Sequence, residues 1–471
     1  MIENVLASRY ASAEMKQIWD PAGRIRLERE LWIAVLEAQR RLGLDVADEV
    51  VEAYRAVVDQ VDLRSIADRE RVLRHDVKAR LEEFNHLAGH ESIHLGMTSR
   101  DLTENVEQLQ VRRSLEVVLT RAVAAIIGMA DLAARYAAVP ITGRTHNVPA
   151  QVTTIGKRFA SAGEELIYAV ERVEAVLAGL PLRGIKGPVG TQADQAELLG
   201  DPVAADELDR LVAEYLGFEA TLGSVGQVYP RSLDLDVVSV LNLLAAAPSS
   251  FTTTLRLMAG HELATEGFGQ DQVGSSAMPH KMNARTSERI HGFKVILAGH
   301  LAMAAGVSGE QWNEGDVSCS VVRRVMLPDA FFAIDGLFQA FLTVLDEVGF
   351  YPAMIEHELM VNLPFLATTR LLVAAVRAGS GRETAHEVIR RHAVAAALDR
   401  RQHPDGAPGL LERLAEDPEF PLTIDAIREA IDSPLTFTGR AADQVEAFVA
   451  SAADLARRHP AAATYRPEAI L

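Results

Sequence analysis

The fold class is decided by residues 102–138, LTENVEQLQVRRSLEVVLTRAVAAIIGMADLAARYAA. This stretch holds no proline, and its Val, Leu and Ile residues recur at three- and four-residue spacing, which predicts one long helix. Residues 152–180 and 331–348 have a similar pattern. Residues 235–264 predict another long helix, which Pro248 must kink or interrupt. Helices of such length need partners along their whole length, so the sequence predicts a helix bundle.

The composition agrees with a helical fold. Ala, Leu, Glu and Arg dominate, aromatic residues make up only 6%, and alternating strand patterns are scarce, so the predicted class is all-α. Gly- and Pro-rich connections at residues 182–191 and 349–352 separate helical stretches. We expect three parts, which are an N-terminal helical domain at 1–99, a central long-helix domain at 100–350 and a C-terminal helical domain at 351–471.

The charge of the chain restricts its partners. Its 471 residues include 47 basic and 65 acidic side chains, so the formal net charge is −18. Such a chain lacks the positive field that attracts nucleic acid or an anionic membrane, so we expect neither partner. The single cysteine, Cys319, fits a reducing compartment. We read no secretory signal and expect charged residues to interrupt every apolar stretch before it reaches membrane-spanning length, which predicts a soluble cytoplasmic protein.

Residues 266–283, EGFGQDQVGSSAMPHKMN, contain the most informative motif. Three glycines and a proline predict a mobile loop, and Ser275, Ser276, Lys281 and Asn283 put hydroxyls, a cation and an amide on it. The loop could be a lid that closes over an anion, or an ordinary surface loop, since Gly-Ser runs are common in linkers. Its spacing of Gly, Lys and Ser does not match a phosphate-binding P-loop.

Three of the 14 histidines stand in polar settings, namely His75 in RHDVK, His94 in HLGMTS and His146 in GRTH. Histidine is the usual general acid or base near neutral pH, although most histidines are surface or packing residues. His86, His90 and His94 have the i, i+4, i+8 spacing of a zinc site. Glycines interrupt that helix and no further ligand is evident, so we expect no metal.

Several segments resemble the fumarase/aspartase superfamily of helical lyases. SSAMPHKMN resembles the superfamily signature, although Ala284 replaces the proline that usually follows. Within the superfamily the chain resembles the adenylosuccinate lyase family, in order and nearly end to end, through LASRYAS (6–12), RHDVKA (74–79), IHLGMTS (93–99), GRTHNVPAQVTTIGKR (143–158), GIKGPVGTQA (184–193), QVYPRSLDLDVVSVL (227–241), SERIHGFK (287–294) and FTGRAADQV (437–445). Argininosuccinate lyase is the nearest alternative, and a non-catalytic protein such as a lens crystallin is another.

The resemblance implies a three-part helical fold whose central helices assemble into a homotetramer, with each active site shared between subunits. It implies elimination of fumarate from adenylosuccinate, which gives AMP, and from SAICAR, which gives AICAR, without a cofactor. It makes Ser275 the general base and His146 the general acid. The substrate-binding residues that it implies are Arg9, Tyr10, Arg74, His75, Asp76, His94, Thr98, Ser99, Thr145, Gln227, Lys281, Asn283, Arg289, Ser320 and Arg324.

Overall fold

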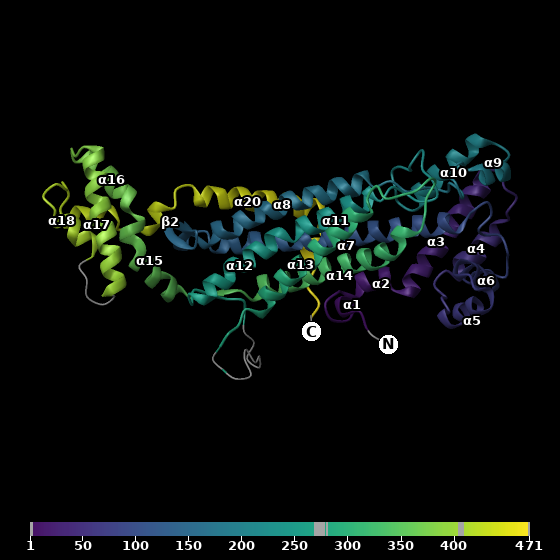
Figure 1. The fold of residues 1–471 in the computed structure, drawn as a ribbon, viewed down its shortest axis with the longest axis horizontal. Helices are drawn as coiled ribbons and strands as arrows, with labels where there is room; N and C mark the ends of the chain where they lie inside the picture. Colours follow the sequence, from purple (N-terminus) through teal and green to yellow (C-terminus); the bar gives the residue numbers. More distant parts are fainter. Residues whose placement is uncertain (1–2, 268–277, 279–280, 404–408, 470–471) are drawn as a thin grey trace.

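The chain forms a long helical rod (Figure 1). The computed structural model describes residues 3–267, 278, 281–403 and 409–469. In these ranges the only strands are two short antiparallel pairs, so the predicted all-α class is confirmed.

Long helices fill the middle of the rod and bury one continuous hydrophobic core. Residues 102–138, the stretch that decides the fold, correspond to the 37-residue helix α7. Residues 331–348 correspond to the second half of the 30-residue helix α14. They pack with four further helices, and the bundle consists of α7 (Ser99–Arg135), α8 (Ile155–Gly179), α11 (Ser232–Leu244), α12 (Ala246–Gly260), α13 (Arg285–Val307) and α14 (Ser318–Glu347). The predicted bundle is therefore confirmed.

Pro248 lies beside a break between two helices. The predicted helix over residues 235–264 is divided at Ala245 into α11 and α12. Pro248 is the third residue of α12, in the first helical turn, where backbone N–H groups have no partner inside the helix. The proline therefore marks the start of a helix and breaks no hydrogen bond within it.

The prediction of a helix over residues 152–180 is wrong at its beginning. A β-hairpin of β1 (Pro140–Thr145) and β2 (Val148–Thr154) comes first, and α8 begins at Ile155, where the Thr154 side chain caps it. His146 and Asn147 form the turn with positive φ angles of 53° and 61°. Two such residues in succession are typical of the tight turns that match the twist of a hairpin. The second pair joins β3 (Ala264–Thr265) to β4 (Gly349–Phe350).

Shorter helices form the two ends of the rod (Figure 1). One end contains α3 (Pro21–Arg41), α4 (Asp48–Ala56), α5 (Leu63–Leu73), α6 (Asp76–Ala88), α9 (Ala193–Leu199) and α10 (Pro202–Tyr215). Before it, α1 (Val5–Arg9) and α2 (Ala13–Trp19) pack along the bundle, against α14 and α7. The other contains α15 (Pro352–Leu366), α16 (Thr368–Arg377), α17 (Arg382–Gln402), α18 (Leu410–Glu416), α19 (Ile424–Ala430) and η1 (Pro434–Phe437). From there α20 (Ala441–Arg458) and α21 (Pro460–Thr464) return along α7. The division at residues 99 and 350 stays a prediction.

The expectation that charges interrupt every apolar stretch is wrong for four stretches. By length and composition alone, α7, α11 with α12, α13 and α14 are long and apolar enough to cross a membrane. In α7 and α14 most of the apolar window, 72% and 83%, is buried inside the bundle. In α13 only 28% is buried, so this helix has an unusually large exposed apolar surface for a bundle member.

Candidate active site

The first turn of α7 is fixed by a buried carboxylate. Thr98 and Asp101 form a capping box, in which the Thr98 N–H donates to Asp101 Oδ2 at 2.8 Å. The other oxygen, Oδ1, accepts from Arg183 Nη1 at 2.6 Å and from the Lys186 and Gly187 amides, each at 2.9 Å. Asp101 therefore joins Thr98 to the glycine-rich loop that precedes α9.

Gln227 is held beside this region through its backbone. Its N–H donates to the Glu314 carbonyl at 2.6 Å, just before α14. The neighbouring Gly226 carbonyl accepts from Arg183 Nη2 at 3.0 Å. The structure thus brings three predicted segments together, which are the start of α7, the loop before α11 and the start of α14, where Ser320 and Arg324 lie.

A network of buried charged side chains joins these segments to one another. Arg231 and Arg323 both approach Glu104 of α7, and Arg323 also pairs with Asp234 at 2.6 Å. The Tyr229 hydroxyl donates to Asp234 at 2.7 Å. Taking these charges out of water is tolerated because each has a partner. The network fixes the loop that carries Gln227.

His94 lies close to the same region in a positive-φ conformation, with φ of 67°. Its Nδ1 accepts a hydrogen bond from Trp32 Nε1 at 3.0 Å, so the ring is neutral in this arrangement. Burial lowers the pKa of His94, with Asp101 opposing the shift and His75 and Lys78 reinforcing it. His94 is therefore kept in the neutral imidazole form.

The segment Arg74–His75–Asp76 joins α5 to α6. Arg74 ends α5 with φ of 53°, and His75 Nδ1 accepts from the Lys78 N–H at 3.3 Å. Burial raises the pKa of Asp76, but the opposing effects of Arg80, the Val77 N–H and His75 together outweigh it, and the net shift is downward. The helix α6 ends at Ala88, where Gly89 reverses the backbone, so His86, His90 and His94 are not on one continuous helix. Among the described residues no group of three His, Cys, Asp or Glu side chains could hold a metal.

Arg9 and Tyr10 end α1 against the bundle. The Tyr10 ring meets Phe293 of α13 edge-on, with 5.1 Å between ring centroids. Arg289 lies one turn before Phe293 on the same helix. The segment is also anchored by Ser12, whose N–H donates to the buried Asp335 carboxylate at 2.6 Å. Arg9, Tyr10 and Arg289 therefore share one part of the bundle.

Thr145 and His146 are exposed at the tip of the β1–β2 hairpin. The strand β1 packs against α15, and Arg144 beside the tip is paired with Glu358 of that helix. Ser275 lies outside the described residues. Lys281 is exposed and Asn283 is half-buried, just before α13. The structure therefore leaves the predicted acid, His146, apart from the start of α7.

Within the described part of one chain, the predicted residues do not come together in a single site. The hairpin with His146 lies toward one end of the bundle, and α6, which follows His75, lies at the other (Figure 1). The residues that hold the loops, Asp101, Arg183 and Arg323, were not predicted from the sequence. The sequence did contain one sign of them. Charged residues occur within the apolar pattern of α7, and a bundle helix can bury such residues only against oppositely charged or hydrogen-bonding partners.

Comparisons with known proteins agree with this architecture. A family model described as "Lyase" matches residues 13–297, and one described as "Adenylosuccinate lyase C-terminus" matches residues 364–448. Adenylosuccinate lyase from Saccharomyces cerevisiae is 35% identical over 94% of this chain and 93% of the relative. The protein of that name from Schizosaccharomyces pombe is 33% identical, again over 94% and 93%. A crystal structure of fumarate lyase from Mesorhizobium sp. BNC1 has a TM-score of 0.79 at 19% identity, covering 94% of this chain and 98% of that one.

The fold and the match over more than half of the chain define a helical lyase, as in the fumarase/aspartase superfamily. Within that class, the chain belongs to the adenylosuccinate lyase family. The predicted family, the predicted fold class and the prediction of an enzyme are confirmed. The roles of individual site residues stay predictions.

Proposed function

We propose that this chain eliminates fumarate from adenylosuccinate, giving AMP, and from SAICAR, giving AICAR. The observation that carries this function is the near full-length similarity to proteins named adenylosuccinate lyase, together with the C-terminal family match. In the reaction a base removes a proton from the succinyl carbon next to a carboxylate. The carbon–nitrogen bond then breaks, the carbon–carbon double bond of fumarate forms, and an acid protonates the leaving nitrogen.

The physical difficulty is the charge of the intermediate. Removing the proton places a second negative charge beside an existing carboxylate, so the site must supply fixed donors and cations. Thr98 and Ser99 begin a 37-residue helix whose N-terminus is electropositive. Gln227 lies beside them, and Lys281 and Asn283 would arrive with the lid. These residues bind the succinyl carboxylates, with His94 as a neutral donor near them.

Ser275 is the general base and His146 the general acid. A serine hydroxyl is a poor base until its alkoxide is stabilised, and Lys281 on the same loop supplies a positive charge for this. Arginine suits a phosphate because its planar guanidinium donates two parallel hydrogen bonds. The phosphoribosyl part of the substrate is therefore bound by Arg9, Tyr10, Arg289, Ser320 and Arg324, and the segment Arg74–Asp76 with Thr145 completes the nucleotide site.

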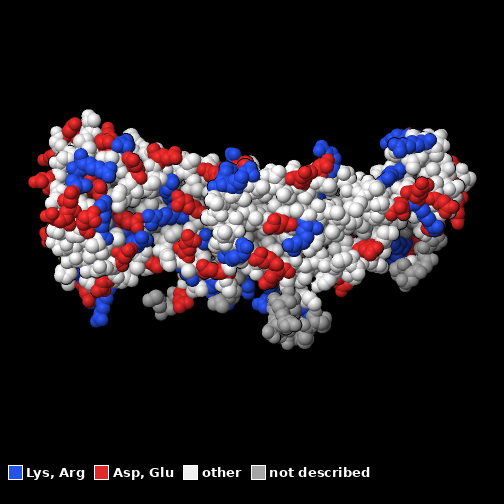
Figure 2. All heavy atoms as spheres, turned by 180° about the vertical axis from the view of Figure 1, so that it is seen from behind, with Lys and Arg blue, Asp and Glu red and all other residues white. Residues whose placement is uncertain are grey.

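We propose a cytoplasmic homotetramer with shared sites. The separation of His146 from the start of α7 within one chain supports this, because other copies of the rod would have to supply the missing groups. The exposed apolar surface of α13 supports it as well, with Val295, Ile296 and Met303 all accessible. Figure 2 shows long uncharged stretches along the middle of the rod, whereas charged side chains of both signs crowd the end formed by the N-terminal helices.

Two inactive variants test the roles and the sharing together. Ser275→Ala and His146→Ala should each lower turnover at least several hundredfold, as expected for loss of an acid or base, in an assembly of unchanged mass. Mixing the two variants under conditions that exchange subunits should restore part of the activity, because some sites then hold both native residues. Near-normal fumarate release by either variant would overturn the assignment, and no recovery on mixing would overturn the shared site.

Substrate and metal dependence are tested with the wild-type enzyme. Fumarate release should be seen with adenylosuccinate and with SAICAR and not with argininosuccinate. Activity should be unchanged by EDTA, because the mechanism needs only the groups named above. A loss of activity with EDTA that zinc reverses would contradict the assignment of a metal-free site.

A further inference from the structure

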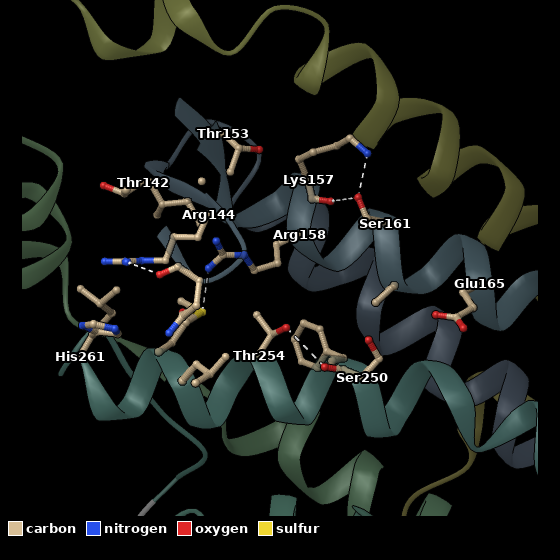
Figure 3. A pocket seen from close by; sticks show the side chains of 18 residues that line it. Thr142, Arg144, Thr153, Lys157, Arg158, Ser161, Glu165, Ser250, Thr254 and His261 are labelled. Atoms are coloured by element: carbon tan, nitrogen blue, oxygen red, sulfur yellow. Dashed lines mark hydrogen bonds between the residues drawn. The ribbon is translucent and has the colours of Figure 1, made fainter. Parts of the chain in front are cut away.

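A cavity of about 460 Å³ lies between the β1–β2 hairpin, α8 and α12 (Figure 3). None of the residues that we assign to the substrate lines it. Its volume falls in the range of about 300–1,000 Å³ that small-molecule sites occupy. Its lining combines apolar side chains, among them Phe251 and Leu263, with hydroxyl groups and cations. This is the composition of a ligand site.

Two guanidinium groups lie in this cavity. Arg158 extends from α8 toward Arg144 of β1 (Figure 3), and its Nη1 lies 3.0 Å from Met258 Sδ. A thioether sulfur is a weak acceptor, so most of the N–H donors of Arg158 are not used well. Burial lowers the pKa of Arg158, and the nearby charge of Arg144 lowers it further, against an opposing effect of Glu358.

The positive charges here exceed the negative ones. Glu358 pairs with Arg144, but among the described residues no carboxylate lies within ion-pair distance of Arg158 or Lys157. The Lys157 Nζ donates only to Ser161 Oγ, at 2.8 Å. Glu165, the one carboxylate among the lining residues, lies at the far side of the view from Arg158 (Figure 3). A half-buried guanidinium beside a second one is unfavourable unless an anion joins them.

We propose that this cavity binds a phosphate dianion between Arg144 and Arg158, either as free phosphate or as the phosphate group of a small organic phosphate. Thr254 and His261 of the α12 side face the same space (Figure 3) and supply further donors. Phosphate carries a charge of about −1.5 to −2 at pH 7. Arg144 and Arg158 donate to it directly, because guanidinium groups match phosphate oxygens in pairs. Lys157, whose ammonium bonds Ser161 farther away in Figure 3, adds positive charge at longer range.

A ligand here would act on the hairpin that carries His146. Arg144 and Asn147 both line the cavity, and in the chain they flank Thr145 and His146. An anion held between Arg144 and α8 therefore restrains the tip of the hairpin. The cavity is an effector site behind the catalytic hairpin and is separate from the substrate phosphate site at Arg9, Arg289 and Arg324.

Counting bound phosphate tests the proposal. Isothermal titration of the wild-type enzyme with inorganic phosphate should give two sites for each chain, one in this cavity and one in the catalytic site. Arg158→Met should lose one site, Arg324→Met the other, and Lys157→Met should weaken the cavity site several-fold without abolishing it. Arg172→Met, on the same helix but outside the cavity, is the matched control and should keep two sites. An unchanged number of sites in folded Arg158→Met overturns the proposal.

Two further measurements identify the ligand and its effect. AMP that binds the Arg158-dependent site more tightly than phosphate indicates an organic phosphate, and equal affinity indicates free phosphate. Fumarate that displaces phosphate from this site in Arg324→Met would overturn the phosphate assignment in favour of a dicarboxylate. Phosphate should slow hydrogen exchange of the 141–147 amides in Arg324→Met, which keeps the cavity site, but not in Arg158→Met, which loses it. Equal protection of these amides in both variants would contradict the effect on the hairpin. The loss of a site in Arg158→Met does not depend on the proposed reaction, whereas the second site, which Arg324→Met removes, rests on the proposed function, so the two failures can be told apart.

Discussion

His94 links the stability of the protein to pH. Burial places its folded-state pKa below the ordinary value of 6.5. As the pH falls below that value, the unfolded chain takes up a proton before the folded chain does, so the stability present at neutral pH decreases. We expect the free energy of unfolding, measured with urea, to fall between about pH 6.5 and the lower folded-state pKa, and to fall less steeply in His94→Gln.

The comparison for this prediction is His386→Gln, at an exposed position on α17, which should keep the pH dependence of the wild type. His300, whose pKa is also lowered by burial, contributes in the same direction, so the slope decreases without disappearing in His94→Gln. Identical slopes for wild type and His94→Gln would contradict the assignment of a half-buried neutral ring.

The carboxylate of Asp101 holds the start of α7 in place. This carboxylate and the Arg183 guanidinium are both fully buried, 2.6 Å apart. Asp101→Ala leaves that guanidinium buried without its partner, which typically costs about 3–5 kcal/mol. We expect a loss of this size in the free energy of unfolding, measured by denaturant titration. Glu207→Ala, which breaks only an exposed pair with Arg210, should change it by less than about 1 kcal/mol. Equal losses in the two variants would contradict this role.

At the scale of elements, the loop before α11 is positioned by a close backbone approach. A Cβ atom added at Gly226 would lie 2.1 Å from the Glu314 carbonyl oxygen, whereas one added at Gly223 would meet nothing within 4 Å. Gly226→Ala must therefore displace Gln227 from its hydrogen bond to Glu314. A displacement of about 1 Å can lower kcat/KM on the order of 100-fold, so we expect that loss with adenylosuccinate. Gly223→Ala is the control, and equal kcat/KM values would contradict the proposed place of Gln227.

The long helices could be predicted from the sequence, and the hairpin could not. The periodicity of residues 102–138 extends over ten turns, so local pattern alone specifies α7 within a few residues. Residues 148–154 form a short segment that continues without a break into the apolar pattern of α8. Their strand conformation depends on pairing with residues 140–145, which the local pattern does not show. The sequence predicts that Pro248 interrupts a helix. It does not show that the break falls at Ala245, which places Pro248 in the first turn of α12.

At the scale of the whole molecule, the sequence predicts which residues form the site, and these stay predictions, but it does not predict how one chain groups them. The motifs name His146, Thr98 and Arg9 without stating which of them one chain brings together. That depends on the length and direction of the rod, which places the hairpin and α6 toward opposite ends. The buried network around Asp101 and Arg323 depends equally on long-range contacts. In the proposed tetramer, the arrangement of the site is therefore a property of the assembly.

The exposed apolar face of α13 provides a test of that assembly. Val295 and Met303, about two turns apart, are 58% and 43% exposed. In the proposed tetramer they are buried, and replacing both with Glu would place charges without partners in the interface. The double variant Val295→Glu/Met303→Glu should give a lower mass by light scattering than the wild type, and its activity should fall with dissociation. Val203→Glu, at a 71% exposed position on α10 at the end of the rod, should leave both unchanged. A double variant that keeps the mass of four chains would show that α13 is not an interface, and full activity in single chains would contradict a site shared between subunits.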